Sequence, residues 1–419
     1  MSEETSPTVF AGVDWATQKH DVCVVDGQGR VLGERTFAAD AAGLSALADW
    51  LVETARVAAQ RVPVAIEVPH GPVVEALLER GFAVHAINPK QLDRFRDRFS
   101  VAGAKDDRRD ARALADSLRT DARAYRRIDN DHADVIELRE WSRMAADLTV
   151  EDVALCNQAR QQLSRFYPQI LELSGDPGEA FVLALLEAAP TPAKAQRLRS
   201  ATIQALLRDH KIRRLRTDEV LAILRKPALV VAAGTAEAAV GHLRQLAARI
   251  RLVRRQLAEC REKLDEIFAR LGAEEVQGRK NEPRDVEILL SLPGVGRIVA
   301  ASLLAEASRP LRDRDYQALR TLSGVAPVTK RSGKTLVVEM RRACNPRLRN
   351  ALHHAARNAG QSDDAWKIRC AAMRAGGQTH GRACRGVADA LLRVVLAMLR
   401  TRTLYDPSKI GATRAKAAA

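Results

Sequence analysis

The sequence predicts an α/β domain followed by two mostly helical parts, and three observations lead to that fold class. Short runs of Val, Ile, Ala and Cys separated by turn residues fill most of residues 8–87, as strands of a sheet do. Apolar residues repeat in heptads in the middle of the chain, where a long helix is expected. Residues 341–419 alternate Arg and apolar positions at helical spacing. The 419 residues, 46% of them apolar, suffice for two or three cores.

The first part of the chain reads as a mixed sheet with helices on its faces. Strands are predicted at residues 9–14, 21–25, 31–37, 63–67 and 83–87, and helices at 42–58, 72–79, 89–99 and 107–118. Asp26-Gly27-Gln28-Gly29 supplies a hairpin turn between the second and third strands. The β-β-β-α-β-α-β order is that of an RNase H-like fold, and also of the actin and sugar-kinase fold. The charged stretch 119–131 predicts a domain boundary, placed after residue 128.

The middle of the chain is predicted to be a coiled-coil arm. Apolar residues from Ala239 to Leu271 follow one another in steps of four and three for more than four heptads. A weaker partner runs from Leu138 to Phe166 and is interrupted where Asp152 falls on the seam. The two could pair within one chain as an antiparallel arm or pair between subunits. We assign the arm to residues 129–277, a small helical insertion to 168–235, and a C-terminal domain to 278–419.

Four carboxylates form a candidate metal site. Asp14 and Glu67 each end a predicted strand, and Asp107 and Asp110 lie three residues apart on a predicted helix. Four converging carboxylates suit hard cations such as Mg²⁺ or Mn²⁺, and a pair of such ions can clamp the oxygens of a phosphoryl transfer. Each acid taken alone could instead cap a turn or a helix. Asp106 is an alternative to Asp107, because it also shares a helix face with Asp110.

A Pro-Gly-Val-Gly turn between two helical segments is a candidate contact to nucleic acid. Residues 292–300 carry Gly294, Gly296 and Arg297 in this turn, between helices predicted at 286–290 and 299–306. Backbone N–H groups at such a helix start can hold a DNA phosphate without reading bases. The pattern predicts a helix-hairpin-helix, although an ordinary helix turn would have the same sequence.

A basic loop around Ser332 is the candidate for covalent chemistry. Lys330, Arg331 and Lys334 surround this serine and could bind a scissile phosphate and stabilise a serine alkoxide. The residues alone favour a simple phosphate contact over a nucleophile. Arg347 and Arg349 follow on a predicted helix at 346–358 and are candidates for nucleic-acid binding.

Net charge divides along the chain and limits the possible partners. The formal charge is +15, yet residues 1–100 hold ten Lys and Arg against fourteen Asp and Glu, while residues 341–419 hold sixteen against four. An acidic front and a basic rear predict metal binding and phosphate binding respectively. The six cysteines form no C-x-x-C pair, and no leader or uninterrupted apolar span is visible, so we expect a reduced, cytoplasmic protein associated with the nucleoid.

The order of these motifs resembles that of transposases of the insertion-sequence 110 family. The motifs that carry the resemblance are Gly12-Val13-Asp14-Trp15-Ala16, Ile66-Glu67, Lys105 to Ala111, Leu292 to Ala300, Arg331-Ser332-Gly333 and Arg347 to Leu352. They cover both ends of the chain and leave 168–235 unaccounted for. One motif departs from the family pattern: the usual Gly-x-x-Arg-Leu-Arg begins with Cys344 here, which predicts a different local turn.

The resemblance implies a RuvC-type RNase H-like domain with a D-E-D-D tetrad, a coiled-coil arm, and a C-terminal domain with a catalytic serine. By position the tetrad would be Asp14, Glu67, Asp107 and Asp110, binding Mg²⁺ or Mn²⁺, with Ser332 as nucleophile. It also implies a dimer or tetramer that recombines donor and target DNA on a structured guide RNA. Three alternatives stay open: a RuvC-like junction nuclease that cuts with water, a non-enzymatic DNA-bridging protein, and a sugar-kinase-like ATPase, which would need Gly-rich phosphate loops absent here.

Overall fold

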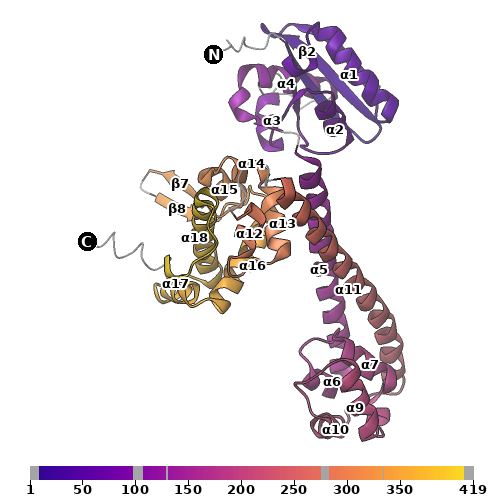
Figure 1. The fold of residues 1–419 in the computed structure, drawn as a ribbon. Helices are drawn as coiled ribbons and strands as arrows, with labels where there is room; N and C mark the ends of the chain where they lie inside the picture. The colour runs from indigo at the N-terminus through magenta and orange to yellow at the C-terminus, as the bar shows by residue number, and fades with distance from the viewer. Residues whose placement is uncertain (1–8, 98–106, 129–130, 275–282, 334, 410–419) are drawn as a thin grey trace, which may run out of the picture. The chain divides into compact units, whose positions relative to one another are not determined.

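The computed structural model describes residues 9–97, 107–128, 131–274, 283–333 and 335–409. By its internal contacts the chain divides into two units, Met1–Asp131 and His132–Ala419, which are described separately here (Figure 1). The predicted start of the last domain, at 278–281, and the residues on either side of the predicted boundary at 128 lie partly outside the described residues. The three-part domain division stays a prediction.

The first unit is built on a six-stranded mixed sheet with the order β3-β2-β1-β4-β5-β6. Its strands are β1 (Val9–Trp15), β2 (Lys19–Asp26), β3 (Val31–Ala38), β4 (Pro63–Ile66), β5 (Ala83–Ala86) and β6 (Arg126–Arg127). β4 runs parallel to β1 and β5, and the other neighbours are antiparallel. The predicted mixed α/β class is confirmed, and this architecture is compatible with an RNase H-like domain. The short β6 was not predicted, because two adjacent arginines carry no strand pattern.

Helices cover both faces of this sheet, and the side chains of each face belong to a hydrophobic cluster of their own. On one face α1 (Ala41–Ala55) and α2 (Pro72–Glu79) bury Leu47 and Leu77 against β1 residues such as Val13. On the other, α3 (Pro89–Arg96) and α4 (Asp107–Thr120) bury Leu92 and Leu114 against Phe10 and Ala65. The 3-10 turns are Ala59–Arg61 and Ala122–Ala124.

Gly12 sets how closely α4 approaches the sheet. A Cβ added at this position would lie 2.1 Å from the Ala111 carbonyl oxygen and 2.5 Å from the Ala115 nitrogen, which no real side chain could tolerate. The backbone of α4 therefore rests directly on β1, two residues before Asp14, and a larger residue would push the helix outward.

The second unit begins with two long helices that pack along each other within one chain. α5 (Ala133–Phe166) and α11 (Thr235–Glu274) form the arm seen in Figure 1. Ion pairs from Asp134 to Arg270 and from Asp152 to Arg254 fix an antiparallel register. The seam predicted from Ala239 onward is buried against α5, so the alternative of pairing only between subunits does not account for it. Asp152, the break in the predicted seam, has Arg254 as its partner at 2.8 Å.

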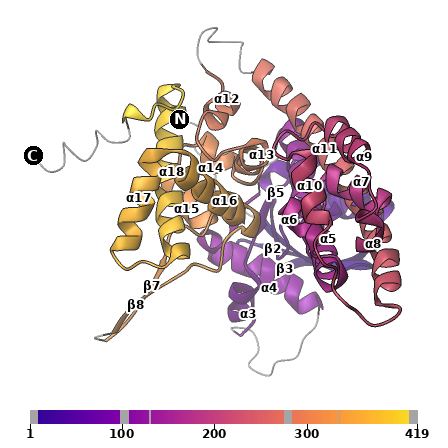
Figure 2. The same cartoon turned by 90° about the horizontal axis from the view of Figure 1, so that it is seen from below.

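Five short helices pack together against the end of the arm. They are α6 (Gln169–Leu173), α7 (Ala180–Ala188), α8 (Pro192–Ala195), α9 (Ser200–Asp209) and α10 (Thr217–Leu224). Phe181, Ile203 and Leu224 are fully buried among them, and Figure 2 shows the cluster beside the ends of α5 and α11. The predicted helical insertion thus shares one hydrophobic core with the neighbouring residues of α5 and α11.

The C-terminal part is mostly helical, as predicted. Its elements are α12 (Asp285–Leu290), α13 (Arg297–Glu306), α14 (Ser308–Arg312), α15 (Tyr316–Leu322), β7 (Val328–Ser332), β8 (Thr335–Glu339), α16 (Pro346–Ser362), α17 (Asp364–Ala375) and α18 (His380–Thr401). Leu138 of α5 and Leu264 of α11 join the core of α13, α16 and α18, which anchors the arm. The β7–β8 hairpin replaces the predicted loop, and the run Leu336-Val337-Val338 was the strand signal within it.

Two general features concern the compartment. All six cysteines are free thiols. Among the described helices, none is long and apolar enough to cross a membrane.

Candidate active site

Asp14 and Glu67 leave the sheet side by side. β1 and β4 are parallel neighbours with Val13 opposite Ile66, and each acid is the next residue of its chain. Because side chains alternate along a strand, Asp14 shares the face of Gly12 and Glu67 shares that of Ala65. Both of those residues lie beneath α4. The two carboxylates therefore emerge at one edge of the sheet, on the face that α4 covers.

α4 supplies a third carboxylate to the same face. Asp110 lies one residue before Ala111, whose carbonyl is the group nearest to Gly12, and only 4% of its surface is exposed. The helix begins at Asp107, one turn before Asp110, in agreement with the predicted spacing. The side chain of Asp107, and Asp106 as its alternative, lie outside the described residues.

Arg96 of α3 connects two of these acids. One of its terminal nitrogens, Nη2, lies 3.6 Å from Glu67 Oε2, and its Nε lies 2.7 Å from Asp110 Oδ1. The Nε contact is an ion pair that is not aligned as a hydrogen bond, which leaves this buried N–H unsatisfied. Glu67 and Asp110 are thus close enough to share one cation, and oxygen donors of this kind fit Mg²⁺ or Mn²⁺. Within the described part of the chain, no three His, Cys, Asp or Glu side chains are arranged as a metal site.

Asp21 is a further acid at this edge that sequence reasoning missed. It lies directly opposite Asp14 in the β1–β2 ladder and is 3% exposed. Thr36 Oγ1 donates a hydrogen bond to one of its oxygens, and the Lys19 ammonium lies 3.1 Å from the other. The strand alternation Lys19-His20-Asp21 was the available signal, since it places Asp21 on the face of Asp14.

Ser332 occupies the tip of the β7–β8 hairpin. It is exposed, is the last residue of β7, and lies opposite Thr335 in the ladder. Gly333 follows with a φ of 54°, as a tight turn requires. A second serine, Ser323, contrasts with it: Ser323 is fully buried and donates its hydroxyl to the Leu319 carbonyl at 2.7 Å. Of the two, only Ser332 presents its hydroxyl to solvent.

The Pro-Gly-Val-Gly turn joins α12 to α13, as predicted, but its glycines have different surroundings. Gly294 has a φ of 80°, and a Cβ there would lie 2.3 Å from the Ala355 carbonyl oxygen of α16. Its role in the fold is this close packing. Gly296 is the exposed N-cap of α13, and no atom would crowd a Cβ added there. Arg297 forms an ion pair with Asp265 of α11.

The predicted phosphate-binding cations also divide into two groups. Arg347 contacts Asp147 of α5 at 3.1 Å, and Lys330 contacts Glu339 across the hairpin at 2.6 Å, so both already have carboxylate partners. Arg331 is exposed at the hairpin tip, and Arg349 donates a hydrogen bond to the Cys344 sulfur. Lys334 lies outside the described residues. In the turn before α16, the Asn345 side chain accepts hydrogen bonds from the Arg347 and Leu348 N–H groups.

Comparisons with known proteins bear on these sites. Residues 11–168 match a transposase model for the DEDD domain of IS110 elements, and residues 286–369 match the model described as transposase, IS116/IS110/IS902 family. The mini-circle protein of IS117 from Streptomyces coelicolor, named as a transposase, is 35% identical over 423 residues, covering 99% of this chain and 100% of that relative. The chain belongs to the IS110 family of transposases.

Other relatives of this transposase match over different lengths. The protein y4uE of Sinorhizobium fredii, also named as a transposase, is 55% identical over 206 residues, 49% of this chain and 57% of that relative. The 44.8 kDa protein of IS116 from Streptomyces clavuligerus is 25% identical over 405 residues, 96% of each chain. The prediction of an IS110-family transposase, an enzyme that acts on DNA, is confirmed.

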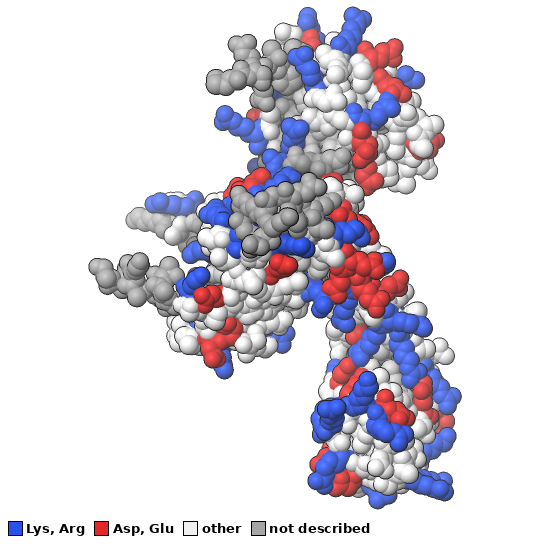
Figure 3. Space-filling model, viewed as in Figure 1, with Lys and Arg blue, Asp and Glu red and all other residues white. Residues whose placement is uncertain are grey.

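The two matched segments include every candidate site residue of this transposase. The carboxylates and Arg96 fall in the first segment, and Ser332 and Arg349 fall in the second. The helices α6 to α10 lie in neither. In Figure 3, acidic side chains gather on the arm near its junction with the C-terminal core, where Glu140, Asp147 and Glu151 line a shallow hollow.

Proposed function

We propose that this transposase cuts and rejoins DNA through Ser332 as nucleophile, assisted by a divalent metal at Asp14, Glu67, Asp107 and Asp110. The observation that carries the proposal is that Asp14 and Glu67 follow the ends of two neighbouring parallel strands, while Glu67 and Asp110 share the Arg96 cation. An enzyme that handles DNA phosphates has a direct use for such a cation site.

The serine step needs an exposed hydroxyl that can reach a DNA backbone. The Ser332 oxygen attacks phosphorus and loses its proton, and the deoxyribose oxygen leaves and gains one. A phosphoserine ester results, with the bond energy of the phosphodiester kept. Attack by the hydroxyl of another strand then reverses the step and frees Ser332. Arg331, exposed beside it, can stabilise charge on the phosphate oxygens.

The metal, when bound, would neutralise charge that develops on the phosphate oxygens. The carboxylates would hold it, with Mg²⁺ favoured and Mn²⁺ as the alternative. Arg96 lies between Glu67 and Asp110 in the structure described here, and its positive charge reduces the repulsion between these two acids.

The proposal includes a structured guide RNA, a homodimer or homotetramer, and a cytoplasmic, nucleoid-associated location. The α5–α11 pair supports a coiled-coil arm within one chain, and the α12–α13 turn, with Gly296 exposed, supports a helix-hairpin-helix. Residues Gly294, Gly296, Arg297, Lys330, Arg331, Lys334, Arg347 and Arg349 stay in the proposal as the nucleic-acid contact region.

Strand exchange on a circular donor tests the two chemical roles. We expect Asp14→Ala, Glu67→Ala and Ser332→Ala proteins to lose recombination by at least about 10²-fold, as removal of a nucleophile or a metal ligand does. Thr335→Ala is the matched control, because it removes the hydroxyl opposite Ser332 in the same hairpin. Full recombination by Ser332→Ala would remove the serine from the mechanism, and full recombination by Asp14→Ala would remove the metal site.

The main alternative is a RuvC-like junction nuclease, which the same carboxylate arrangement would suit. Trapping separates the two, because a serine nucleophile leaves a covalent protein–DNA adduct that Ser332→Ala abolishes. Free cut ends without any adduct would instead identify the nuclease.

The RNA part has its own test. Sequencing of RNA that copurifies with the full chain should give one structured species. A random mixture would count against guidance and leave the DNA chemistry untouched.

A further inference from the structure

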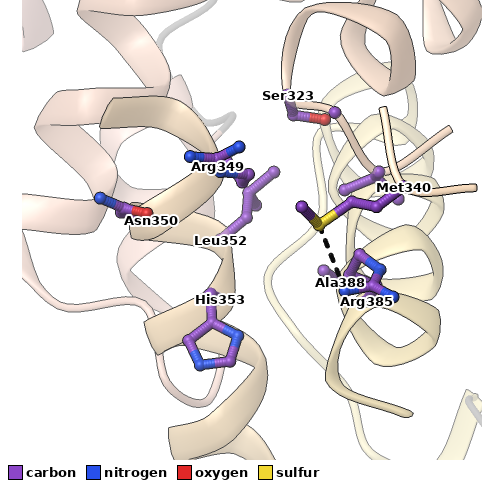
Figure 4. Close-up of a pocket in the computed structure, with 10 residues that line it drawn as sticks. Ser323, Met340, Arg349, Asn350, Leu352, His353, Arg385 and Ala388 are labelled. Atoms are coloured by element: carbon purple, nitrogen blue, oxygen red, sulfur yellow. Dashed lines mark hydrogen bonds between the residues drawn. The ribbon is translucent and has the colours of Figure 1, made fainter. Parts of the chain in front are cut away.

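A cavity of about 200 Å³ lies in the C-terminal core behind the β7–β8 hairpin. Its wall comes from three places: the turn after α15, the residue that follows β8, and the facing sides of α16 and α18. Figure 4 shows Arg349 and His353 of α16 on one side, with Met340 and Arg385 on the other. Leu352 and Val325 add apolar surface. The cavity is thus part cationic and part apolar.

Two guanidinium groups in this wall lack a strong acceptor. Arg349 Nη1 donates to Cys344 Sγ at 3.7 Å, and Arg385 Nη1 donates to Met340 Sδ at 3.5 Å. Sulfur is a weak acceptor. Neither arginine has a carboxylate within ion-pair distance in the described residues, although both are half-buried. Half-buried cations without a counter-ion raise the free energy of the empty cavity and favour an anion in it.

The acids nearest along the chain are engaged elsewhere. Glu339, next to Met340, contacts Lys330, and Asp389, next to Ala388, contacts Arg320 and Arg393. α16 contains no acidic residue.

The groups that face His353 are all cationic or neutral bases: His354, His380, Arg357 and Arg385. Burial first, and these neighbours second, hold the pKa of His353 below its ordinary value. Arg385 thus lies near both Met340 and His353, and its positive charge adds to that of Arg349 in the cavity wall.

We infer that this cavity binds one backbone phosphate of the DNA strand, with Arg349 and Arg385 as its ligands and Met340 and Leu352 against the adjoining sugar. The cavity stands on its own geometry, while the choice of DNA rests on the proposed function. β8 runs from Thr335 to Glu339, so Met340 lies about 17 Å from the residue opposite Ser332, at about 3.3 Å per residue. That span corresponds to a few nucleotides, so the bound phosphate is not the one Ser332 attacks.

The test compares two double variants with equal loss of charge. Arg349→Gln with Arg385→Gln removes both ligands, and Arg374→Gln with Arg382→Gln removes two exposed cations of the helices α17 and α18 that do not line the cavity. Full-length protein with Ser332→Ala as background isolates binding from cleavage, so failure of the serine mechanism cannot mimic failure of this site. We expect the first variant to bind DNA about 10- to 100-fold more weakly, the effect of losing a charge-assisted hydrogen bond, and the second to bind far less than 10-fold more weakly.

Neutral methylphosphonate groups, placed one at a time along the DNA, locate the phosphate. We expect one position, a few nucleotides from the cleaved bond, to weaken wild-type binding and to have no further effect on the Arg349/Arg385 variant. Persistent sensitivity at that position, or equal loss by both double variants, would overturn the inference. A loss confined to RNA binding would overturn the choice of DNA. Arg349→Lys with Arg385→Lys should restore part of the affinity, because lysine also binds phosphate as a point charge, and this recovery excludes misfolding as the cause of the loss.

Discussion

At the scale of single residues, the acidic edge depends on Arg96 and Gly12. Gly12 lets α4 rest on β1 and so brings Asp110 to the edge where Asp14 and Glu67 emerge. Arg96 then places one positive charge between Glu67 and Asp110. Carboxylates this close repel unless a cation lies among them. A divalent ion and the Arg96 guanidinium are thus two ways to meet one electrostatic requirement.

Replacement of Arg96 by Gln should make the first unit depend on metal. Without metal we expect the melting temperature of the Arg96→Gln protein to fall by a few degrees, since about 1 kcal/mol of ion pairing is lost. Mg²⁺ should raise it by more than it raises the wild type, because the ion replaces the missing charge. Differential scanning calorimetry with and without Mg²⁺ measures both. Arg94→Gln, an exposed position on the same helix, is the control, and an equal response to Mg²⁺ in both variants would contradict the expectation.

At the scale of elements, one buried carboxylate joins three helices of the second unit. Glu306 ends α13, contacts Arg143 of α5 at 2.8 Å, and accepts a hydrogen bond from the Asn345 side chain at 2.7 Å. Asn345 also caps α16. Burial alone would raise the pKa of Glu306, but the hydrogen bonds from Arg143 and Asn345 outweigh it and hold the pKa below the ordinary value. The contact between α5 and the C-terminal helices therefore depends on the Glu306 carboxylate being ionised.

Acid should weaken this junction in the wild type and not in Glu306→Gln. The folded pKa is depressed, so its contribution to stability is complete above the ordinary pKa of about 4.5 and is lost as the pH falls through the folded value. At pH 7 we expect Glu306→Gln to cost about 2 kcal/mol of unfolding free energy. Urea unfolding across pH 3–7 should show the gap from wild type closing at the acidic end. The exposed Glu259→Gln is the control, and a gap that stays constant with pH would refute the assignment.

At the scale of the whole molecule, the C-terminal part carries the positive charge that the proposed DNA binding requires. Many cations of the C-terminal part, among them Arg342, Arg357 and Arg382, have no carboxylate within ion-pair distance in the described residues. The arm differs, since several of its Arg side chains tie α5 to α11 or to the small helical cluster, as Arg254 does with Asp152 and Asp176. The excess positive charge available to DNA therefore belongs to the C-terminal part.

DNA binding by the full chain should depend steeply on salt. If six or more phosphates are contacted, the affinity should fall by about 10³-fold between 50 and 200 mM salt, because the bound protein displaces condensed cations. Fluorescence anisotropy with labelled duplex measures the slope of log affinity against log salt. A slope shallower than about −2 would mean that most of these cations do not touch the backbone.

The sequence pattern predicted most strands and helices of the first unit but missed some exposed strands. The strands β1 to β5 follow from short apolar runs between turn residues, since β1, β2 and β4 are buried on both faces, and the helices α1 to α4 follow from helical apolar spacing. The predicted elements also placed the four candidate carboxylates. Asp14 and Glu67 stand at strand ends, and Asp107 and Asp110 lie three residues apart on a helix. β6 was not predicted, because two adjacent arginines carry no strand pattern, and the exposed β7–β8 hairpin was missed although the run Leu336-Val337-Val338 in β8 favours a strand.

The sequence by itself determined the family, the partner class and the candidate chemistry, because those depend on residue types in a fixed order. Only the tertiary structure decided that the heptad seam pairs within one chain, that Gly294 packs against α16, and that Arg297 and Arg347 have acidic partners. It also brought Arg349 and Arg385, 36 positions apart in the sequence, to one cavity. The physical reason is that residues distant in the sequence come into contact only when the elements pack together. Local residue spacing therefore does not indicate which charged groups will form an ion pair.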